Sequence, residues 1–388
     1  MNILFLLRAL DLGGLEIVTA TLANKFVEEG HHVCVFAFEK RSGMLQSRFR
    51  QDVLVTIAGK YQVTNENVTL MRNVMKRNHI QVVINQWGLP LIPIRTLNKA
   101  KKGMDLKMIS VYHNDPFKNG RLQNVETEMQ KSDNHLRRFL LHCKKFTYRC
   151  ITGFSMRYNY NHSNLYSVLS KSYVSHFQQF TWLKFTPRLV ALSNPITIGA
   201  EEFAYQSELK KKEIIYVGRL DPVQKHVHRV IEVWALLERS NPDWHLIIVG
   251  DGPERERLKN MVSSMELKRV HFEGFQQPRS YYEKASMLIL TSDFEGFPLV
   301  LAECMSFGVV PVVYGSFSAV YDIIDNEKNG IIIPQTSSGF NATMMAEEIQ
   351  KLTTDKQRID QMAKSAIEKS QLFSLDRISE QWLRLIQH

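Results

Sequence analysis

Residues 287–303 have the sequence MLILTSDFEGFPLVLAE, in which a short apolar run gives way to a polar loop and then to a second apolar segment. The run at 287–290 predicts a buried strand. Pro298 fits the first turn of a helix, where its missing N–H costs no hydrogen bond. The stretch therefore predicts a strand–loop–helix unit, with the loop at the carboxyl end of a strand in a parallel sheet.

The same alternation of short apolar runs with amphipathic segments continues through most of the chain, as expected for a parallel sheet. A helix is predicted over Leu15–Glu29, ended by Gly30, a residue that tolerates left-handed backbone. In the first half of the chain we predict strands at Asn2–Leu7, His32–Phe38, Val53–Ile57, Val82–Asn85, Lys107–Tyr112, Leu165–Leu169 and Arg188–Ala191. In the second half we predict strands at Glu213–Val217, His245–Val249, Val270–Phe272, Met287–Leu290, Val309–Val313 and Gly330–Ile333.

The alternation lapses between residues 194 and 212, where the chain becomes polar and rich in lysine, and then restarts. At 388 residues the chain is also longer than one hydrophobic core usually serves. We therefore predict an α/β protein of two doubly wound, Rossmann-like domains, 1–200 and 201–365, facing a central cleft. A C-terminal helix over 366–388 is predicted to pack back across the domain junction. Ligands of such sheets bind at the carboxyl ends of the strands.

The composition is that of an ordinary globular protein, with 44% hydrophobic and 23% charged residues, which excludes a disordered or collagen-like chain. The four cysteines form no Cys-x-x-Cys pair, which argues against a zinc ribbon and fits a reducing compartment. The apolar run at 3–7 is too short for a secretory signal, and no run reaches about 18 apolar residues. These features predict a soluble, cytoplasmic protein.

The net charge of +10 is unevenly distributed, because residues 134–200 contain no Asp or Glu. This segment also carries interleaved aromatic residues and the cations Arg137, Arg138, Lys144, Lys145, Arg149, Arg157, Lys171, Lys184 and Arg188. A basic and aromatic face suits an anionic membrane surface, a phosphate-bearing acceptor or a nucleic acid. A solvated positive face without a partner is the alternative. No helix-turn-helix, RRM or KH signature is present, so a nucleic-acid partner is not predicted.

Gly13 and Gly14 lie between the first predicted strand and the first predicted helix. Paired glycines allow the backbone to approach a ligand closely, and the start of the helix offers free N–H groups to an anion. They do not follow the Gly-x-Gly-x-x-Gly pattern of a dinucleotide site. An ordinary tight turn is therefore an alternative to an anion site.

Arg219 and Lys225 follow the first strand of the second predicted domain. Two cations at a strand–helix junction can neutralise a diphosphate without a metal ion. Two ordinary surface cations in a loop are the alternative.

The opening stretch carries two acidic residues, Glu295 in the loop and Glu303 in the predicted helix. The amides of Gly296 and Phe297, and those of Leu299 and the residues after it, would point at an anion from the start of this helix. The two carboxylate oxygens of Glu303 can accept hydrogen bonds from two adjacent hydroxyls, such as those of a ribose. The alternative is a capping Glu followed by an ordinary helical Glu.

Taken together, these motifs resemble those of the family-4 (group 1) glycosyltransferases of surface and capsular polysaccharide biosynthesis, which have the GT-B fold. Glu295 to Glu303 resembles the family's Glu-x7-Glu motif. Residues 13–16 resemble its glycine loop, and 218–220 with Lys225 resemble its diphosphate-binding pair. Residues 249–253, 322–324 and 329–330 also stand in the family's order. Nearly the whole chain is covered by the resemblance.

The resemblance implies roles for individual residues. Arg219 and Lys225 would hold the two phosphates of a nucleotide sugar and stabilise the leaving diphosphate. Glu303 would bind the ribose, and Glu295 would bind hydroxyls of the transferred sugar. The other implied contacts are Gly13 and Gly14 over the phosphates, Gly296, Phe297, Pro298 and Leu299 around the donor, and His113 near the anomeric carbon. The catalytic set would then be Glu295, His113, Arg219 and Lys225.

The resemblance also implies a reaction: retaining transfer of a hexose-type sugar from a UDP-sugar, or next a GDP-sugar, to a lipid-linked or oligosaccharide acceptor. The enzyme would work peripherally at the cytoplasmic face of a membrane, docked through the basic segment 134–200. No cofactor or metal is expected, since no Asp-x-Asp follows a predicted strand. Residues 314–318 depart from the family's glycine pair, which leaves donor preference open. The alternative is that the protein has the same fold but is catalytically inactive and only binds a nucleotide or a glycan.

Overall fold

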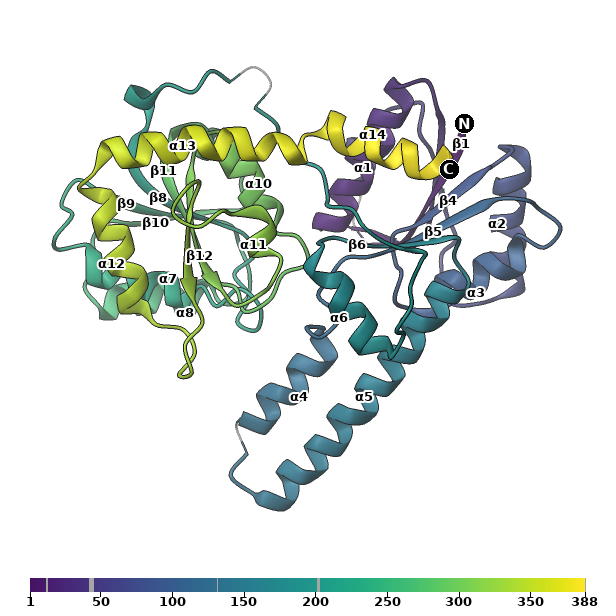
Figure 1. Ribbon diagram of the computed structural model, residues 1–388, viewed down its shortest axis with the longest axis horizontal. Coiled ribbons are helices and arrows are strands. Elements are labelled where there is room, and N and C mark those ends of the chain that lie inside the picture. The colour runs from purple at the N-terminus through teal and green to yellow at the C-terminus, as the bar shows by residue number, and fades with distance from the viewer. Residues whose placement is uncertain (12, 42–44, 131, 201–202, 388) are drawn as a thin grey trace. The chain divides into compact units, whose positions relative to one another are not determined.

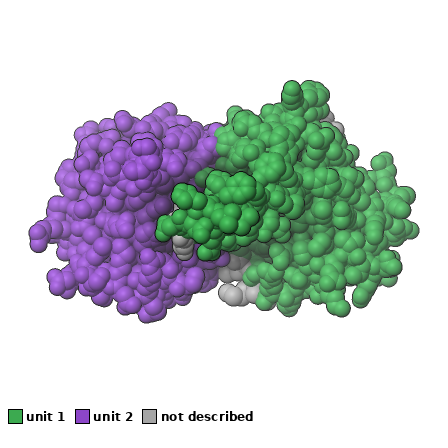
Figure 2. Space-filling model, turned by 90° about the horizontal axis from the view of Figure 1, so that it is seen from below, with its two compact units in different colours: residues 1–197, 375–388 green, residues 198–374 purple. Residues whose placement is uncertain are grey.

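The computed structural model describes residues 1–11, 13–41, 45–130, 132–200 and 203–387. These residues form two compact units (Figure 2). Unit 1 consists of residues 1–197 and 375–388, and unit 2 of residues 198–374. The predicted boundary between residues 200 and 201 falls beside residues outside the described ranges. Each unit is built on a parallel sheet with helices against it (Figure 1), so the predicted α/β class with two Rossmann-like domains is confirmed.

The described part of unit 1 contains a sheet in the order β3-β2-β1-β4-β5-β6-β7, in which every neighbouring pair is parallel. Its strands are β1 Asn2–Leu10, β2 His32–Lys40, β3 Leu54–Ile57, β4 Val82–Asn85, β5 Lys107–Tyr112, β6 Leu165–Val168 and β7 Leu189–Ala191. Its α-helices are α1 Gly14–Glu28, α2 Asn65–Arg77, α3 Leu91–Ala100, α4 Gly120–Gln130, α5 His135–Asn161, α6 Ser172–Thr181 and α14 Leu375–Gln387.

Unit 2 repeats this plan with the order β10-β9-β8-β11-β12-β13, again all parallel. Its strands are β8 Lys211–Val217, β9 His245–Val249, β10 Val270–Gly274, β11 Ala285–Leu290, β12 Val310–Gly315 and β13 Ile331–Pro334. Its α-helices are α7 His228–Leu237, α8 Arg255–Ser264, α9 Arg279–Lys284, α10 Leu299–Ser306, α11 Val320–Ile323, α12 Ala342–Thr353 and α13 Lys356–Ser370. Each strand predicted from the sequence corresponds to one of the strands in the two sheets.

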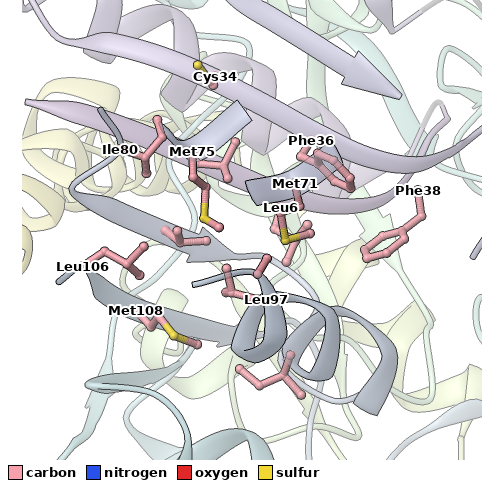
Figure 3. Packing of buried hydrophobic residues seen from close by; sticks show 14 residues of the cluster. Leu6, Cys34, Phe36, Phe38, Met71, Met75, Ile80, Leu97, Leu106 and Met108 are labelled. Atoms are coloured by element: carbon pink, nitrogen blue, oxygen red, sulfur yellow. The ribbon is translucent and has the colours of Figure 1, made fainter. Parts of the chain in front are cut away.

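One core cluster of unit 1 shows why the apolar runs become strands (Figure 3). Leu6 on β1 and Phe36 on β2 are fully buried on one face of the sheet. Met71 and Met75, four residues apart on one side of α2, pack into the same cluster. Strands covered by helices on both faces need continuous apolar sequence, as these have.

Strand β1 continues past the predicted end at Leu7 to Leu10. Arg8 stays in the strand because its guanidinium lies 4.8 Å from the ring centre of Tyr61 and 5.7 Å from that of Trp87. Stacking on aromatic faces lets an arginine occupy a half-buried strand position.

The C-terminal region consists of successive helices, and the predicted start of the last helix at 366 falls within α13. Helix α13 ends at Ser370, a 3-10 turn follows at Gln371–Phe373, and α14 begins at Leu375. Ser374 between them has extended backbone (φ −58°, ψ 150°), and serine is a residue that favours the start of a helix.

Helix α14 belongs to unit 1, where it lies against α1. Lys25 forms an ion pair with Asp376, and the Ser379 hydroxyl donates to a carboxylate oxygen of Glu29 at 3.1 Å. At its other end, Lys107 Nζ donates to the carbonyl of Leu385 at 2.7 Å, which satisfies one of the free carbonyls of the last turn.

The sequence suggested that the acid-free segment 134–200 forms one basic face. In the structure, the segment is instead divided among several elements. It supplies the long helix α5, then strand β6, helix α6 and strand β7, and both strands lie within the sheet. Within the described ranges, no helix combines the length and the apolar character that crossing a bilayer requires.

Candidate functional site

The strand order of unit 2 reverses between β8 and β11, which are neighbours in the sheet although β9 and β10 lie between them in sequence. The chain leaves β8 into the loop at 218–227 and leaves β11 into the loop at 291–298. In open α/β sheets, ligands bind outside the carboxyl ends of the strands at such a reversal. Arg219, Lys225 and Glu295 all lie on these two loops.

Lys225 and Glu295 are in direct contact, with Nζ 2.5 Å from Oε1. The side chains are 16% and 8% exposed, so the pair is largely shielded from water. Gln224 donates through Nε2 to the other oxygen, Oε2 of Glu295, at 3.2 Å. Both oxygens of Glu295 are therefore held by the loop that follows β8. Such a pair is rigid, and removing one partner leaves the other charge poorly compensated.

Arg219 is more exposed than Lys225 and donates to Oδ2 of Asp221 at 2.6 Å. The second oxygen of Asp221 accepts the amides of Val223 and Gln224, at 2.9 and 2.8 Å. Asp221 thereby shapes the loop and orients the guanidinium, while two-thirds of the Arg219 side chain remains accessible. An accessible guanidinium can bind an incoming phosphate through two hydrogen bonds at once.

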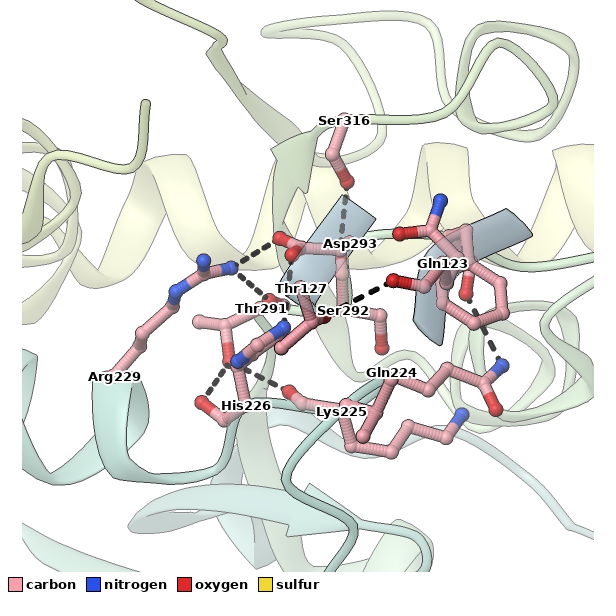
Figure 4. A network of polar contacts seen from close by, with 12 residues as sticks. Gln123, Thr127, Gln224, Lys225, His226, Arg229, Thr291, Ser292, Asp293 and Ser316 are labelled. Carbon is pink, nitrogen blue, oxygen red and sulfur yellow. Dashed lines mark hydrogen bonds and ion pairs between the residues drawn. The ribbon is translucent and has the colours of Figure 1, made fainter. Parts of the chain in front are cut away.

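Asp293, in the loop after β11, contacts residues that follow β8 and so links the two parts of the chain (Figure 4). Its Oδ1 accepts from Arg229 Nη1 at 2.5 Å, and its Oδ2 lies 2.8 Å from Nε2 of His226. Burial raises the pKa of the Asp293 carboxyl, but the neighbouring His226 and Arg229 outweigh burial and leave the pKa below its usual value. The hydroxyl of Thr291 also donates to the carbonyl of His226 at 3.2 Å. The loops are thus fixed before any ligand binds.

The loop after β9 approaches the loop after β8 so closely that side chains are excluded. A Cβ on Gly250 would lie 1.9 Å from the carbonyl oxygen of Gly218, and one on Gly252 would lie 2.5 Å from that of Leu220. Gly250 also has φ +148°, which other residues rarely adopt. These contacts explain why the resembling segment 249–253 is rich in glycine.

Pro298 immediately precedes α10, which begins at Leu299. Phe297 is buried beside it and packs edge-on against Phe373, with ring centres 5.3 Å apart. These contacts fix the start of the helix, where free N–H groups can meet an anion.

Glu303, on α10, is 4% exposed and accepts a hydrogen bond from the hydroxyl of Tyr282 at 3.3 Å. Tyr282 is fully buried, and its backbone carbonyl accepts from Lys210 Nζ at 2.8 Å. Burial lowers the pKa of Lys210 to about 7. Tyr282 thus orients one oxygen of the carboxylate that the sequence analysis assigned to ribose.

In unit 1 the corresponding reversal lies between β1 and β4. Gly13 is the N-cap of α1 and Gly14 its first residue, so the helix begins one residue before the predicted start at Leu15. A Cβ on Gly13 would lie 2.5 Å from a carboxylate oxygen of Glu16, so glycine makes room for that side chain. Burial raises the pKa of Glu16 to about 7.

His113 follows β5, and Gln86 follows the neighbouring β4. Nε2 of His113 lies 2.8 Å from Oε1 of Gln86. Burial lowers the pKa of His113 to about 3, so the imidazole is neutral near pH 7. Because Oε1 only accepts, Nε2 carries the proton and Nδ1 is left as the acceptor.

The structure therefore joins Lys225 to Glu295 directly, and it pairs Arg219 with Asp221 and Glu303 with Tyr282. Gly13, Gly14 and His113 lie at the carboxyl edge of the sheet in unit 1. Sequence reasoning missed Gln86, Gln224, Tyr282, Asp293 and Arg229 as supporting residues. Gln86 had a usable signal, since a polar residue directly after a buried strand lies at the ligand-binding edge.

Two family profiles match the sequence in adjacent segments. The profile described as glycosyltransferase family 4 matches residues 12–196, and the profile described as glycosyl transferases group 1 matches residues 198–369. Together they extend over most of both units.

Among curated relatives, an uncharacterised glycosyltransferase of Haemophilus influenzae is 30% identical over 199 residues, 51% of this chain and 54% of that protein. An exopolysaccharide phosphotransferase of Streptomyces coelicolor is 34% identical over 205 residues, 52% of this chain but 21% of that protein. The chain thus spans about half of one relative and a fifth of the other. A Campylobacter jejuni N-acetylgalactosaminyltransferase, named for a diNAcBac-PP-undecaprenol-linked GalNAc acceptor, is 23% identical over 100% of this chain and 98% of its own.

Solved structures agree on the fold over the full length. Anabaena Alr3699/HepE, solved in complex with UDP, has a TM-score of 0.76 at 17% identity, covering 100% of both chains. The galactosyltransferase WaaB in its apo form has a TM-score of 0.69 at 18% identity, covering 100% of this chain and 99% of its own. The fold is therefore the two-domain GT-B type, and the chain belongs to the family-4 (group 1) glycosyltransferases.

Proposed function

We propose that this protein is a retaining glycosyltransferase that moves a hexose-type sugar from a nucleotide-diphosphate sugar to a lipid-linked or glycan acceptor in surface polysaccharide assembly. The observation that carries the proposal is the shielded contact between Lys225 and Glu295, beside the accessible Arg219, at the strand reversal of unit 2. In that group, Lys225 is fixed beside the carboxylate of Glu295, whereas Arg219 is accessible.

In the proposed reaction, Lys225 and Arg219 bind the diphosphate and stabilise the negative charge that grows on it as it leaves. Glu295 accepts hydrogen bonds from hydroxyls of the transferred sugar. The amides at the start of α10 add a positive dipole next to the phosphate. Because these groups already supply positive charge, the proposal includes no metal ion.

Glu303 would accept hydrogen bonds from the ribose of the donor. Its second oxygen is held by Tyr282, so the carboxylate is presented in one orientation. Binding energy from this remote part of the donor then helps to place the anomeric carbon, which is far from the ribose.

The acceptor oxygen forms its bond to the anomeric carbon on the face from which the diphosphate departs. The bond from that carbon to the phosphate oxygen breaks, and the hydroxyl proton of the acceptor passes to a phosphate oxygen. His113 is neutral over the working pH range and contributes hydrogen bonding near the anomeric carbon without donating a proton. No further residue is needed as a base.

For the donor we propose a UDP-sugar first and a GDP-sugar second. Support comes from one structural neighbour, Anabaena Alr3699/HepE, which has been solved with UDP and also with UDP-glucose. For the acceptor we propose a polyprenyl-diphosphate-linked sugar, supported by the name of the full-length relative from Campylobacter jejuni. Such an acceptor places the enzyme peripherally at the cytoplasmic face of a membrane.

The test is calorimetric titration with UDP, GDP and ADP, without added metal, followed by an assay of nucleotide release with lipid-linked acceptors. We expect UDP to bind and wild type to turn over, while Glu295→Ala abolishes turnover. Glu348→Ala is the control, since Glu348 forms a surface ion pair with Lys351 in the same unit. Binding without turnover on any acceptor would favour the inactive binding protein, and no binding at all would refute the proposal.

A further inference from the structure

Helix α5 differs in its two halves. The helix has 27 residues, which corresponds to about 40 Å. Its second half is anchored in unit 1, where Asn159 donates to the carbonyl of Leu89 at 3.0 Å and Met156 is fully buried. Across the first half and on to residue 151, Leu141 is the one buried residue. Figure 1 shows this half extending with α4 as a hairpin away from the sheet of unit 1.

The exposed side of α5 is apolar. Large apolar side chains that are 51–70% exposed lie along one side of the helix at Leu136, Phe139, Leu140, Phe146, Ile151 and Phe154. Cys143, which is exposed, and Cys150, which is half-buried, continue the same row. We call these eight residues the α5 stripe. The buried residues of the helix, among them Leu141, Thr152 and Met156, lie on the opposite side.

The surroundings of the stripe are basic. Arg137, Arg138 and Arg157 are exposed on α5, and the helix itself has no acidic residue. The acids of α4 that face it are engaged, since Glu128 and Glu126 form ion pairs with Lys144 and Lys145. An apolar row between cations is the composition of a helix that lies in a membrane interface.

A second segment extends the apolar surface beside α5. Trp182 is 52% exposed, and the guanidinium of Arg149 on α5 lies 5.5 Å from its ring centre. Helix α5 approaches this ring at Gly153, where a Cβ would be 2.9 Å from it. Phe185, the most exposed large apolar residue in the described ranges, follows three residues later. Tryptophan and other aromatic rings favour the headgroup level of a bilayer.

We propose that the α5 stripe inserts into the interface of a lipid bilayer that contains anionic headgroups, with the helix lying along the surface. The proposal rests on the proposed function only in that a lipid-linked acceptor gives membrane binding a purpose. A second copy of the chain is a poorer occupant, because a symmetric pairing of two stripes would bring the flanking cations of both copies together.

The test is sedimentation with vesicles of phosphatidylcholine alone or mixed with phosphatidylglycerol. We expect wild type to bind the mixed vesicles and to keep part of this binding in high salt, because apolar burial is not screened. A Phe139→Ser/Phe146→Ser/Phe154→Ser variant should bind at least about tenfold more weakly. The matched control is Phe275→Ser, because Phe275 is similarly exposed (58%) but lies in unit 2.

The native cysteines supply a second readout. Cys34 and Cys304 are buried, so an environment-sensitive fluorophore on the folded protein will label Cys143 first. The emission of the fluorophore attached to Cys143 should shift to the blue with mixed vesicles but not with phosphatidylcholine alone. An unchanged emission, or equal sedimentation of the triple variant and wild type, would overturn the proposal. A dimer in solution that the triple variant abolishes, without vesicle binding, would identify a second copy as the occupant.

Failure of the proposed transferase function and failure of the membrane proposal would give different results in the nucleotide and vesicle assays. The triple variant should retain UDP affinity, whereas Glu295→Ala should retain vesicle binding and lose turnover. A protein that binds vesicles but no nucleotide would refute the transferase proposal and leave the membrane inference standing.

Discussion

The two strand reversals of this protein have the same backbone plan, but charged side chains are paired at one and disfavoured by burial at the other. In unit 2, the loops after β8 and β11 carry paired charges, with Lys225 on Glu295 and Arg229 on Asp293. In unit 1, burial disfavours the charged forms of the groups after β1 and β5, since it raises the pKa of Glu16 to about 7 and lowers that of His113 to about 3. In the proposed function, the edge in unit 2 would meet the charged diphosphate, and the edge in unit 1 would meet less charged groups.

The difference follows from how each edge satisfies its polar groups. A buried charge is tolerated where an opposite charge and further hydrogen bonds compensate it, as Gln224 and Lys225 do for Glu295. Without a counter-ion, burial favours the neutral form of a titratable group, as at His113, whose Nε2 contacts the uncharged Gln86. Three experiments test this difference between the units.

The largest effect is expected from Lys225→Ala. The substitution removes a cation from the proposed diphosphate site and leaves Glu295 without its ion-pair partner, so UDP affinity should fall about a hundredfold. Calorimetric titration measures it. Lys212→Ala is the control, since Lys212 pairs with Asp243 on the surface of the same unit. Equal affinities in the two variants would mean that the charged edge of unit 2 is structural only.

A smaller effect, about tenfold on donor affinity, is expected from Tyr282→Phe, which removes the hydroxyl that orients Glu303. The loss should raise KM for the donor and, because ribose binding helps to place the anomeric carbon, also lower kcat. It should also disappear with 2′,3′-dideoxy-UDP, which has no ribose hydroxyls for Glu303 to hold. A loss of the same size with UDP and its dideoxy analogue would show that Tyr282 acts only on packing.

The smallest effect concerns unit 1 and is one of stability against pH. The folded pKa of His113 is about 3, below its ordinary value of 6.5, so the unfolded chain binds the extra proton first as the pH falls. Wild type should therefore lose stability relative to His113→Gln below pH 6.5, by about 1.4 kcal/mol one pH unit lower. Denaturant unfolding at several pH values measures this. Parallel curves for the two proteins would contradict a neutral, buried His113.

Much of the fold could be predicted because strands buried on both faces must be continuously apolar, and such runs are visible in sequence. The end of β1 could not be predicted in this way, because Arg8 remains in the strand by stacking on Tyr61 and Trp87, which are distant from it in sequence. The last helix was predicted to start at 366 and starts at Leu375, for a local reason, the extended backbone at Ser374.

The placement of candidate residues was predictable where residue type and loop position coincide, as at Lys225 and Glu295, which the structure brings into contact. Tyr282 escaped notice because its role depends on one hydroxyl that reaches Glu303 from a different element. The α5 stripe escaped for a different reason. Its apolar spacing is that of any amphipathic helix, and sequence alone does not tell whether protein or solvent faces it.

Helix α14 covers part of α1 in unit 1, yet it is encoded after the whole of unit 2. On the ribosome, unit 2 can therefore be complete while the face of α1 that α14 covers is still bare. Unit 2 is one continuous segment inserted into unit 1, so it can be excised with two cuts and expressed alone. Unit 1 cannot be obtained by truncation, because its last helix must be rejoined to residue 197.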